Sequence, residues 1–132
     1  MTLAELVASA RTLGPDARRR VEAAGRESVV VTDVTHDSRG VSRGTVFVAI
    51  RGKRADGATF AAEAIRRGAV AIVSEQPILD TTVPWLPSTD VRLALSELAA
   101  ICHGRPSERL TVVGVTGTNG KTTTAYLMAS VL

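Results

Sequence analysis

The sequence predicts an α/β fold, a small mixed or parallel sheet flanked by helices, and three observations support this. Short runs rich in β-branched residues alternate with segments of helical periodicity. Hydrophobic residues make up 45% of the 132 residues but aromatic residues only 3%, so Val, Leu, Ile and Ala must form most of the core. Residues 45–73 also read as strand, helix and strand, a crossover unit that favours parallel pairing.

The amino-terminal elements are two short helices and a strand. Thr2 and Glu5 form a capping-box pattern that opens the first helix, and Gly14 lies beyond its end. A second helix is expected over residues 17–24. Residues 28–34 (SVVVTDV) are rich in β-branched side chains, so they predict the first strand.

The crossover unit follows after a polar turn. Residues 45–50 (TVFVAI) predict the second strand, and Phe60 with the alanines after it marks a helix. Thr59 is the expected N-cap of that helix, and Gly68 the expected residue just past its end. Residues 69–73 (AVAIV) predict the third strand.

Three prolines make residues 77–88 irregular, apart from an edge strand expected near residues 83–86. Asp90 then caps a helix, which ends at Gly104-Arg105-Pro106-Ser107. The predicted apolar face of that helix consists of Leu95, Leu98, Ala99 and Cys102.

The last stretch, residues 110–132, predicts a phosphate-binding loop. An apolar, β-branched run (110–115) leads into Thr116–Thr123, and a helix is expected from Ala125 onward. Glycines let the backbone approach a phosphate, and the first turn of a helix offers unpaired N–H groups. Lys121 adds a charge suited to the β- and γ-phosphates of a nucleotide, and the Thr122 hydroxyl is placed to hold Mg²⁺.

The strict phosphate-loop pattern is not met, because Val115 stands where a first glycine would be, five residues before Gly120. A structural turn rich in Gly and Thr is the alternative. Nucleoside triphosphate binding is the better interpretation, since a structural role hardly explains Gly-Lys-Thr between a strand and a helix.

Charge and composition exclude several functions. The net charge of +3 comes from 16 basic and 13 acidic residues. Because the sequence offers no aromatic stacking surfaces, this charge does not indicate nucleic-acid binding. Residues Arg18–Arg20 fit a solvated helix face. The single cysteine, Cys102, excludes an intrachain disulfide and predicts no metal cluster. An amphipathic pattern containing Glu5 follows Met1 directly, so no signal peptide or membrane span is predicted and the cytoplasm is the expected location.

The chain is expected to divide into two parts, a foldable domain over residues 1–88 and the start of another over residues 89–132. The predicted last helix has no C-cap signal, and a phosphate loop needs further strands to bind a nucleotide. We therefore expect a longer protein, and we expect the apolar segments of residues 89–132 to lack packing partners here.

The sequence resembles the amino-terminal part of the Mur ligases, ATP-dependent amide-forming enzymes that build the peptide of the bacterial cell wall. Three blocks carry the resemblance, in matching order and separation. They are His36-Asp37-Ser38-Arg39 with residues 44–49, residues 52–69 with Asp56-Gly57 inside them, and residues 113–123. The resemblance implies a UDP-binding domain over residues 1–88, followed by the first strand, phosphate loop and helix of a central ATPase domain.

The resemblance also implies site residues. Lys121 would be the catalytic charge and Thr122 the Mg²⁺ ligand, within an ATP-binding loop formed by Gly117, Thr118, Asn119, Gly120, Lys121, Thr122 and Thr123. Substrate contacts would come from two loops at strand carboxyl ends, where open α/β sheets bind ligands. Those contacts are His36, Ser38, Arg39, Lys53, Arg54, Ala55, Asp56 and Gly57. Without the resemblance, a simpler interpretation is that Asp37-Ser38 forms an Asx turn and that Arg39 forms a surface ion pair.

Within the family, the phosphate loop and Gly104-Arg105-Pro106-Ser107 most resemble the third ligase, which adds diaminopimelate or L-lysine to UDP-MurNAc-L-Ala-D-Glu. The fourth ligase, which adds D-alanyl-D-alanine, more often has Ser at position 118. The family implies phosphoryl transfer from ATP to the D-glutamate carboxylate, then attack of the amine on the acyl phosphate. The rest of the ATPase domain and a carboxy-terminal domain are expected beyond residue 132, so this chain alone is expected to be inactive.

Two other classes of protein remain as alternatives. Another ATP-dependent ligase, such as folylpolyglutamate synthetase, would share the phosphate loop but not the Asp-Ser-Arg and Asp-Gly blocks. A stand-alone, non-catalytic UDP-binding module would share those blocks. The sequence leaves open the choice between diaminopimelate and lysine, and also the oligomeric state.

Overall fold

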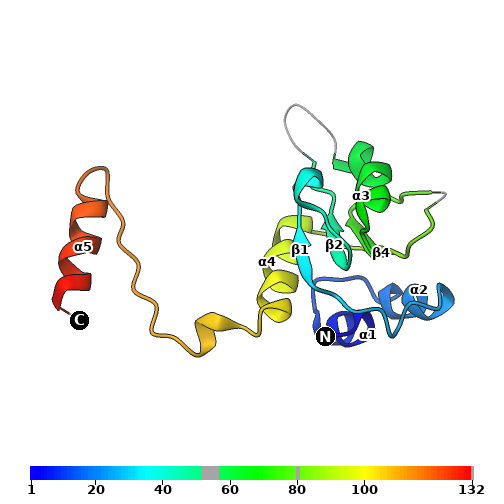
Figure 1. Cartoon of the computed structure of the whole chain (residues 1–132), viewed down its shortest axis with the longest axis horizontal. Helices are drawn as coiled ribbons and strands as arrows, with labels where there is room; N and C mark the ends of the chain where they lie inside the picture. Colours follow the sequence, from blue (N-terminus) through cyan, green and yellow to red (C-terminus); the bar gives the residue numbers. More distant parts are fainter. Residues whose placement is uncertain (52–56, 80, 132) are drawn as a thin grey trace.

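A four-stranded parallel sheet forms the centre of the amino-terminal part of the chain (Figure 1). The computed structural model describes residues 1–51, 57–79 and 81–131. The strand order is β1-β2-β3-β4, and the strands are β1 (Asp33–Thr35), β2 (Thr45–Val48), β3 (Ala71–Ser74) and β4 (Trp85–Pro87). The predicted α/β class is confirmed. Because the strands are parallel, their carboxyl ends lie at one edge of the sheet.

Helices cover both faces of this sheet. One face packs on α1 (Leu3–Ser9), α2 (Ala17–Ala23) and α4 (Val91–Cys102), while the other packs on α3 (Ala61–Arg67). Alternation along β2 shows the division, since Val46 and Val48 face the first group of helices and Phe47 faces α3. Every residue of β2 and β3 is buried, as expected for the central strands of a covered parallel sheet.

Several predicted local signals are confirmed. Thr2 and Glu5 form the capping box of α1. The Oδ1 atom of Asp90 accepts hydrogen bonds from the backbone N–H groups of Arg92 and Leu93, so it caps α4 as expected. Gly68 ends α3 at a φ of 109°. At such a positive φ an L side chain is strained, and glycine is not.

One detail of the predicted helices is wrong. Phe60, not Thr59, is the N-cap of α3, because a short 3₁₀ turn, η2 (Gly57–Phe60), leads directly into that helix. The four predicted residues of α4 do lie on the side that packs on the core, where Leu98 is fully buried together with Val91, Ala94 and Ile101. Of the predicted set, Leu95, Ala99 and Cys102 are only partly buried at the rim of the core, and this burial raises the pKa of the Cys102 thiol.

The first strand is also shorter than predicted. Its amino-terminal half pairs with the beginning of the chain rather than with the sheet. The N–H of Leu3 donates to the carbonyl of Val29 at 2.8 Å, and the N–H of Val31 donates to the carbonyl of Met1 at 2.9 Å. Residues 29–31 therefore join the beginning of the chain to the sheet. Thr32 already bonds to Gly44, just before β2, and Asp33–Thr35 pair with β2 itself.

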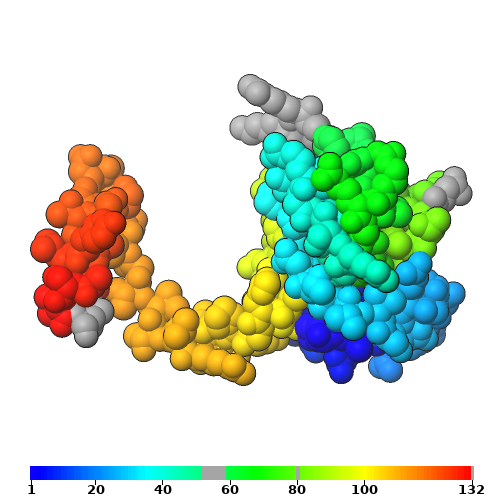
Figure 2. All heavy atoms as spheres, viewed as in Figure 1, coloured from blue at the N-terminus to red at the C-terminus, as the bar shows by residue number. Residues whose placement is uncertain are grey.

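The carboxy-terminal segment stands apart from the sheet (Figures 1 and 2). The expected strand at residues 110–115 is not formed, because no neighbouring strand pairs with it in the described part of the chain, and Val112 is 71% exposed. The last helix, α5 (Lys121–Val131), begins four residues before its predicted start at Ala125. Its large apolar side chains Tyr126, Leu127 and Val131 are exposed.

Helix α4 belongs to the same core as the sheet, although it follows the predicted boundary at residue 88. The Nε2 atom of its C-cap residue, His103, lies 3.3 Å from the Oδ1 atom of Asp33. Glu97 accepts hydrogen bonds from the backbone N–H groups of Arg11 and Thr12, which join α4 to the segment after α1. The packed part of the described chain therefore extends through α4, while the division into domains stays a prediction.

We predict that Gly68→Ala destabilises the fold much more than Gly104→Ala. Both glycines have positive φ, but a Cβ at Gly68 would lie 2.8 Å from the Arg43 Cα, whereas a Cβ at Gly104 meets nothing within 4 Å. We expect a loss of about 3 kcal/mol in the free energy of unfolding for Gly68→Ala and about 1 kcal/mol for Gly104→Ala, measured by urea denaturation. Equal losses would contradict the close backbone approach.

Candidate functional site

The loop after β1 is built around the carboxylate of Asp37. This side chain caps the 3₁₀ turn η1 (Ser38–Gly40), because Oδ1 accepts the backbone N–H of Arg39 at 3.0 Å. The same oxygen accepts Nε of Arg39 at 3.0 Å, and Oδ2 accepts Nη2 at 2.9 Å. The N–H of Asp37 donates to Oγ1 of Thr35 at 3.2 Å. The loop therefore contains both the Asx-type turn and the surface ion pair that the residues alone predicted.

These contacts set the charge of the loop. The side-chain hydrogen bonds from Arg39, its backbone N–H and its positive charge lower the pKa of Asp37 from 3.8 to about 2. The same pairing raises the pKa of Arg39. Asp37 is therefore ionised at neutral pH and holds the guanidinium in a fixed direction, while the Arg39 side chain remains 86% exposed. A ligand at this edge would meet an oriented cation.

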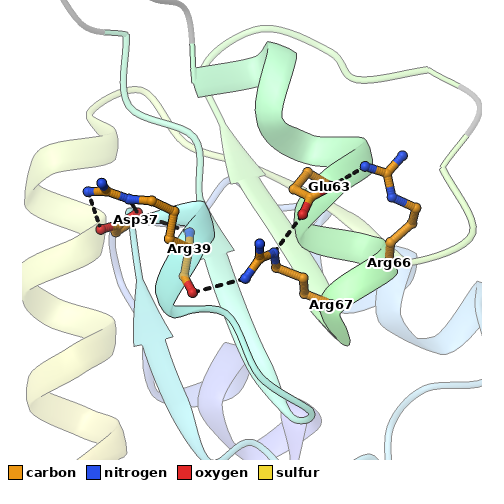
Figure 3. Close-up of polar contacts among 5 residues, drawn as sticks. All are labelled: Asp37, Arg39, Glu63, Arg66 and Arg67. Carbon is orange, nitrogen blue, oxygen red and sulfur yellow. Dashed lines mark hydrogen bonds and ion pairs between the residues drawn. The ribbon is translucent and has the colours of Figure 1, made fainter.

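Helix α3 contacts the same loop through a second group of charged residues (Figure 3). Glu63 accepts hydrogen bonds from Arg67 Nε at 2.6 Å and from Arg66 Nη2. Nη1 of Arg67 donates to the backbone carbonyl of Arg39 at 3.2 Å. The hydrogen bonds from Arg67 and Arg66 lower the pKa of Glu63. The result is a continuous path of polar contacts from α3 to the loop after β1.

The structure describes only some of the residues predicted to contact the substrate. His36 is exposed and Ser38 half-buried in the loop after β1, as expected for residues at the carboxyl edge. Gly57 begins η2, which leads into α3 from the β2 side. Four predicted contacts, Lys53, Arg54, Ala55 and Asp56, lie outside the described residues. The roles of all these residues in binding stay predictions.

The predicted phosphate loop has the backbone expected of an anion site. Gly117 and Gly120 take φ angles of 150° and 76°, and the Gly120 carbonyl accepts the N–H of Thr124 at 2.9 Å as α5 begins. The N–H groups of the first helical turn therefore have no intrahelical acceptor. Lys121 is the first residue of α5, and its Nζ turns back to donate to the Gly117 carbonyl at 2.5 Å. Its charge thus lies over the loop.

This loop fits a nucleotide phosphate by its chemistry. Helix α5 adds its positive dipole end to the Lys121 charge, and both favour an anion at the turn. Thr122 and Thr123 lie in the first helical turn beside Lys121, where a hydroxyl can reach an ion bound to phosphates. The described residues contain no cluster of three or more His, Cys, Asp or Glu side chains able to hold a metal by themselves. A cation here would depend on Thr122 together with the nucleotide.

The two candidate sites do not meet in this chain. The loop after β1 belongs to the packed core, whereas residues 116–123 lie in the segment that stands apart (Figure 1). No helix within the described ranges has the length and apolar character required to span a membrane.

A parallel sheet with polar loops at its carboxyl edge, followed by a glycine-rich turn at a helix amino terminus, is an arrangement typical of nucleotide-binding α/β proteins. Comparison with protein families matches residues 30–102 to "Mur ligase family, catalytic domain". The chain belongs to the Mur ligase family, whose members act in peptidoglycan precursor synthesis.

Individual relatives agree with this family. The chain is 47% identical over 132 residues to UDP-N-acetylmuramoyl-L-alanyl-D-glutamate--2,6-diaminopimelate ligase of Chlorobaculum tepidum, covering 98% of this chain and 25% of that protein. It therefore spans about a quarter of the length of this relative.

Solved structures of two members of the family match the fold. A UDP-N-acetylmuramoyl-L-alanyl-D-glutamate--2,6-diaminopimelate ligase matches 98% of this chain and 25% of its own, with 25% identity and a TM-score of 0.64. MurF from Acinetobacter baumannii matches 91% of this chain and 28% of its own, with 27% identity and a TM-score of 0.65. The MurF ligase of Thermotoga maritima in complex with ADP matches 73% of this chain and 22% of its own, with 37% identity and a TM-score of 0.59.

Sequence reasoning missed Glu63 and Arg67. The i,i+4 spacing of these two residues predicts an ion pair along a helix, but the spacing says nothing about the Arg39 carbonyl. That contact depends on where α3 packs, so it could be found only in three dimensions.

We predict that the pKa of Asp37 depends on Arg39. The pKa of Asp37 is lower in the folded chain than in the unfolded chain, so its carboxylate stabilises the fold. This contribution should be fully present above the ordinary pKa of 3.8 and lost as the pH falls through about 2. Titration of the Asp37 carboxyl carbon by NMR should give a midpoint near 2 in the parent and a higher one, towards 3.8, in Arg39→Met. Arg18→Met, which removes a distant arginine, serves as the control. An ordinary midpoint in the parent would contradict the pairing.

Proposed function

We propose that this chain is the substrate-binding part of an ATP-dependent ligase, together with the start of its ATP site. In this proposal the enzyme adds the third amino acid, diaminopimelate or lysine, to UDP-MurNAc-L-Ala-D-Glu in the cytoplasm. The observation that carries the proposal is the geometry at Lys121. There a flexible glycine turn, a helix amino terminus and a primary amine combine in one phosphate loop.

The residues of the phosphate loop would each have a separate role. The backbone N–H groups at the start of α5 would bind phosphate oxygens, and Lys121 would balance the charge that develops during phosphoryl transfer. Thr122 would hold Mg²⁺ beside the phosphates. ATP supplies the leaving group that a carboxylate needs before an amine can replace it.

The loop after β1 would bind the UDP part of the substrate. A pyrophosphate is bound by arginine, hydroxyl and backbone N–H donors, and this loop offers the oriented Arg39 guanidinium beside Ser38. The carboxyl edge of a parallel sheet is the usual place for such a ligand. Gly57, at the start of η2, and residues 53–56 would complete the contact from β2.

The identity of the added amine rests on sequence similarity. The 47% identity to a diaminopimelate ligase supports addition of the third amino acid. The fold match to MurF keeps D-alanyl-D-alanine addition as a second candidate. A stand-alone UDP-binding module remains the third.

We predict that Lys121→Ala abolishes ligation in the protein extended to the length of its relatives, and leaves the fold unchanged. Lys121 is exposed, so its loss should lower the rate by about a hundredfold or more without affecting thermal unfolding. Ser130→Ala, on the same exposed helix, is the matched control. Near-normal ATP-dependent ligation by Lys121→Ala would refute this assignment.

The same assay decides between the substrates. Supplying diaminopimelate, lysine and D-alanyl-D-alanine separately should give phosphate release with one of the first two only. Turnover with D-alanyl-D-alanine and UDP-MurNAc-tripeptide would instead establish the second candidate.

A further inference from the structure

Arg67 lies between two partners that belong to different parts of the fold (Figure 3). Its Nε donates to Glu63 Oε1, one helical turn earlier in α3, at 2.6 Å. Its Nη1 donates to the backbone carbonyl of Arg39 at 3.2 Å, across 28 positions of sequence. Because Glu63 fixes one side of the planar guanidinium, the other side has a defined direction towards the loop.

The loop that receives this hydrogen bond is otherwise organised by its own residues. Asp37 accepts from Arg39 and donates its N–H to Thr35, and the N–H of Gly40 donates to the Asp37 carbonyl at 3.0 Å. These bonds fix the internal shape of the turn. Val41, directly after the turn, is buried in the same apolar cluster as Ala61 and Ala64 of α3. The hydrogen bond from Arg67 adds a polar contact between α3 and the turn itself.

We propose that Arg67 is a positioning residue for the substrate loop, which acts through the Arg39 carbonyl to hold residues 38–40 at the carboxyl edge of the sheet. This inference rests on the proposed function, because it takes UDP as the ligand of that loop. Arg67 itself need not touch the ligand. The Glu63 carboxylate partly neutralises its charge, so the hydrogen bond to the loop distinguishes Arg67 from its neighbours.

Arg66 provides a matched control on the same helix. It also pairs with Glu63 through Nη2, its side chain is exposed, and its removal changes the net charge by the same amount. Within the described residues its ion-pair partner is Glu63 rather than the loop. A comparison of Arg67→Met with Arg66→Met therefore separates the contact to the Arg39 carbonyl from general electrostatic attraction of a phosphate.

The experiment is calorimetric titration of UDP into the 132-residue chain and both variants, with thermal unfolding of each. We expect Arg67→Met to weaken UDP binding by about tenfold, and Arg66→Met to change it by no more than about twofold. Unfolding midpoints should be the same in all three proteins. As a spectroscopic signature, the amide resonances of residues 38–40 should broaden or shift in Arg67→Met and not in Arg66→Met.

Each remaining outcome decides between the two proposals. If the parent fails to bind UDP, the proposed function falls and this inference falls with it. If the parent binds UDP and the two variants lose affinity equally, only the inference about Arg67 is overturned. A lower unfolding midpoint in Arg67→Met alone would also overturn it, because the side chain would then support the fold as a whole rather than the position of the loop.

Discussion

Complete burial of β2 and β3 is the constraint on which the rest of this structure depends. A parallel strand buried on both faces needs cover from helices on both sides, and its apolar side chains must then alternate between two separate cores. Because the strands are parallel, all of their carboxyl ends lie at the same edge of the sheet. The loop after β1 and the carboxyl end of β2 are therefore neighbours because of how the core is packed, and the chemistry of the site follows from that arrangement.

The sequence predicted those features that short-range physics decides. The capping box at Thr2, the Asp90 cap and the left-handed glycine after α3 each depend on residues within a few positions of one another, and all three were found. The Asx turn at Asp37 belongs to the same class. The parallel crossover was predictable as well, because the strand, helix and strand follow closely in the chain.

Features decided by distant partners were not predictable. Residues 28–32 have the composition of a strand, but Val29 and Val31 hydrogen-bond to the beginning of the chain rather than to β2. Residues 110–115 also have the composition of a strand, yet no strand lies beside them in the described chain. Their β propensity alone therefore does not form a sheet. The hydrogen bond from Arg67 to the Arg39 carbonyl is a third case, since only the packing of α3 creates it.

The phosphate loop differs from the loop after β1 in what holds it. Its shape comes from two glycines, the helix start and the Lys121 contact, all within one segment, and it therefore forms without the support of the sheet. The loop after β1 depends on the packed core and on α3. The two loops therefore depend on different contacts for their shape.

The most direct test of this account is chemical-shift mapping of UDP on the isotopically labelled 132-residue chain. If UDP binds at the carboxyl edge of the sheet, the amides that change most should be those of residues 36–40 and 49–51. Residues at the opposite edge, such as Gly44 and Gly68, should be unaffected. Changes centred on that opposite edge, or none at saturating UDP, would contradict it.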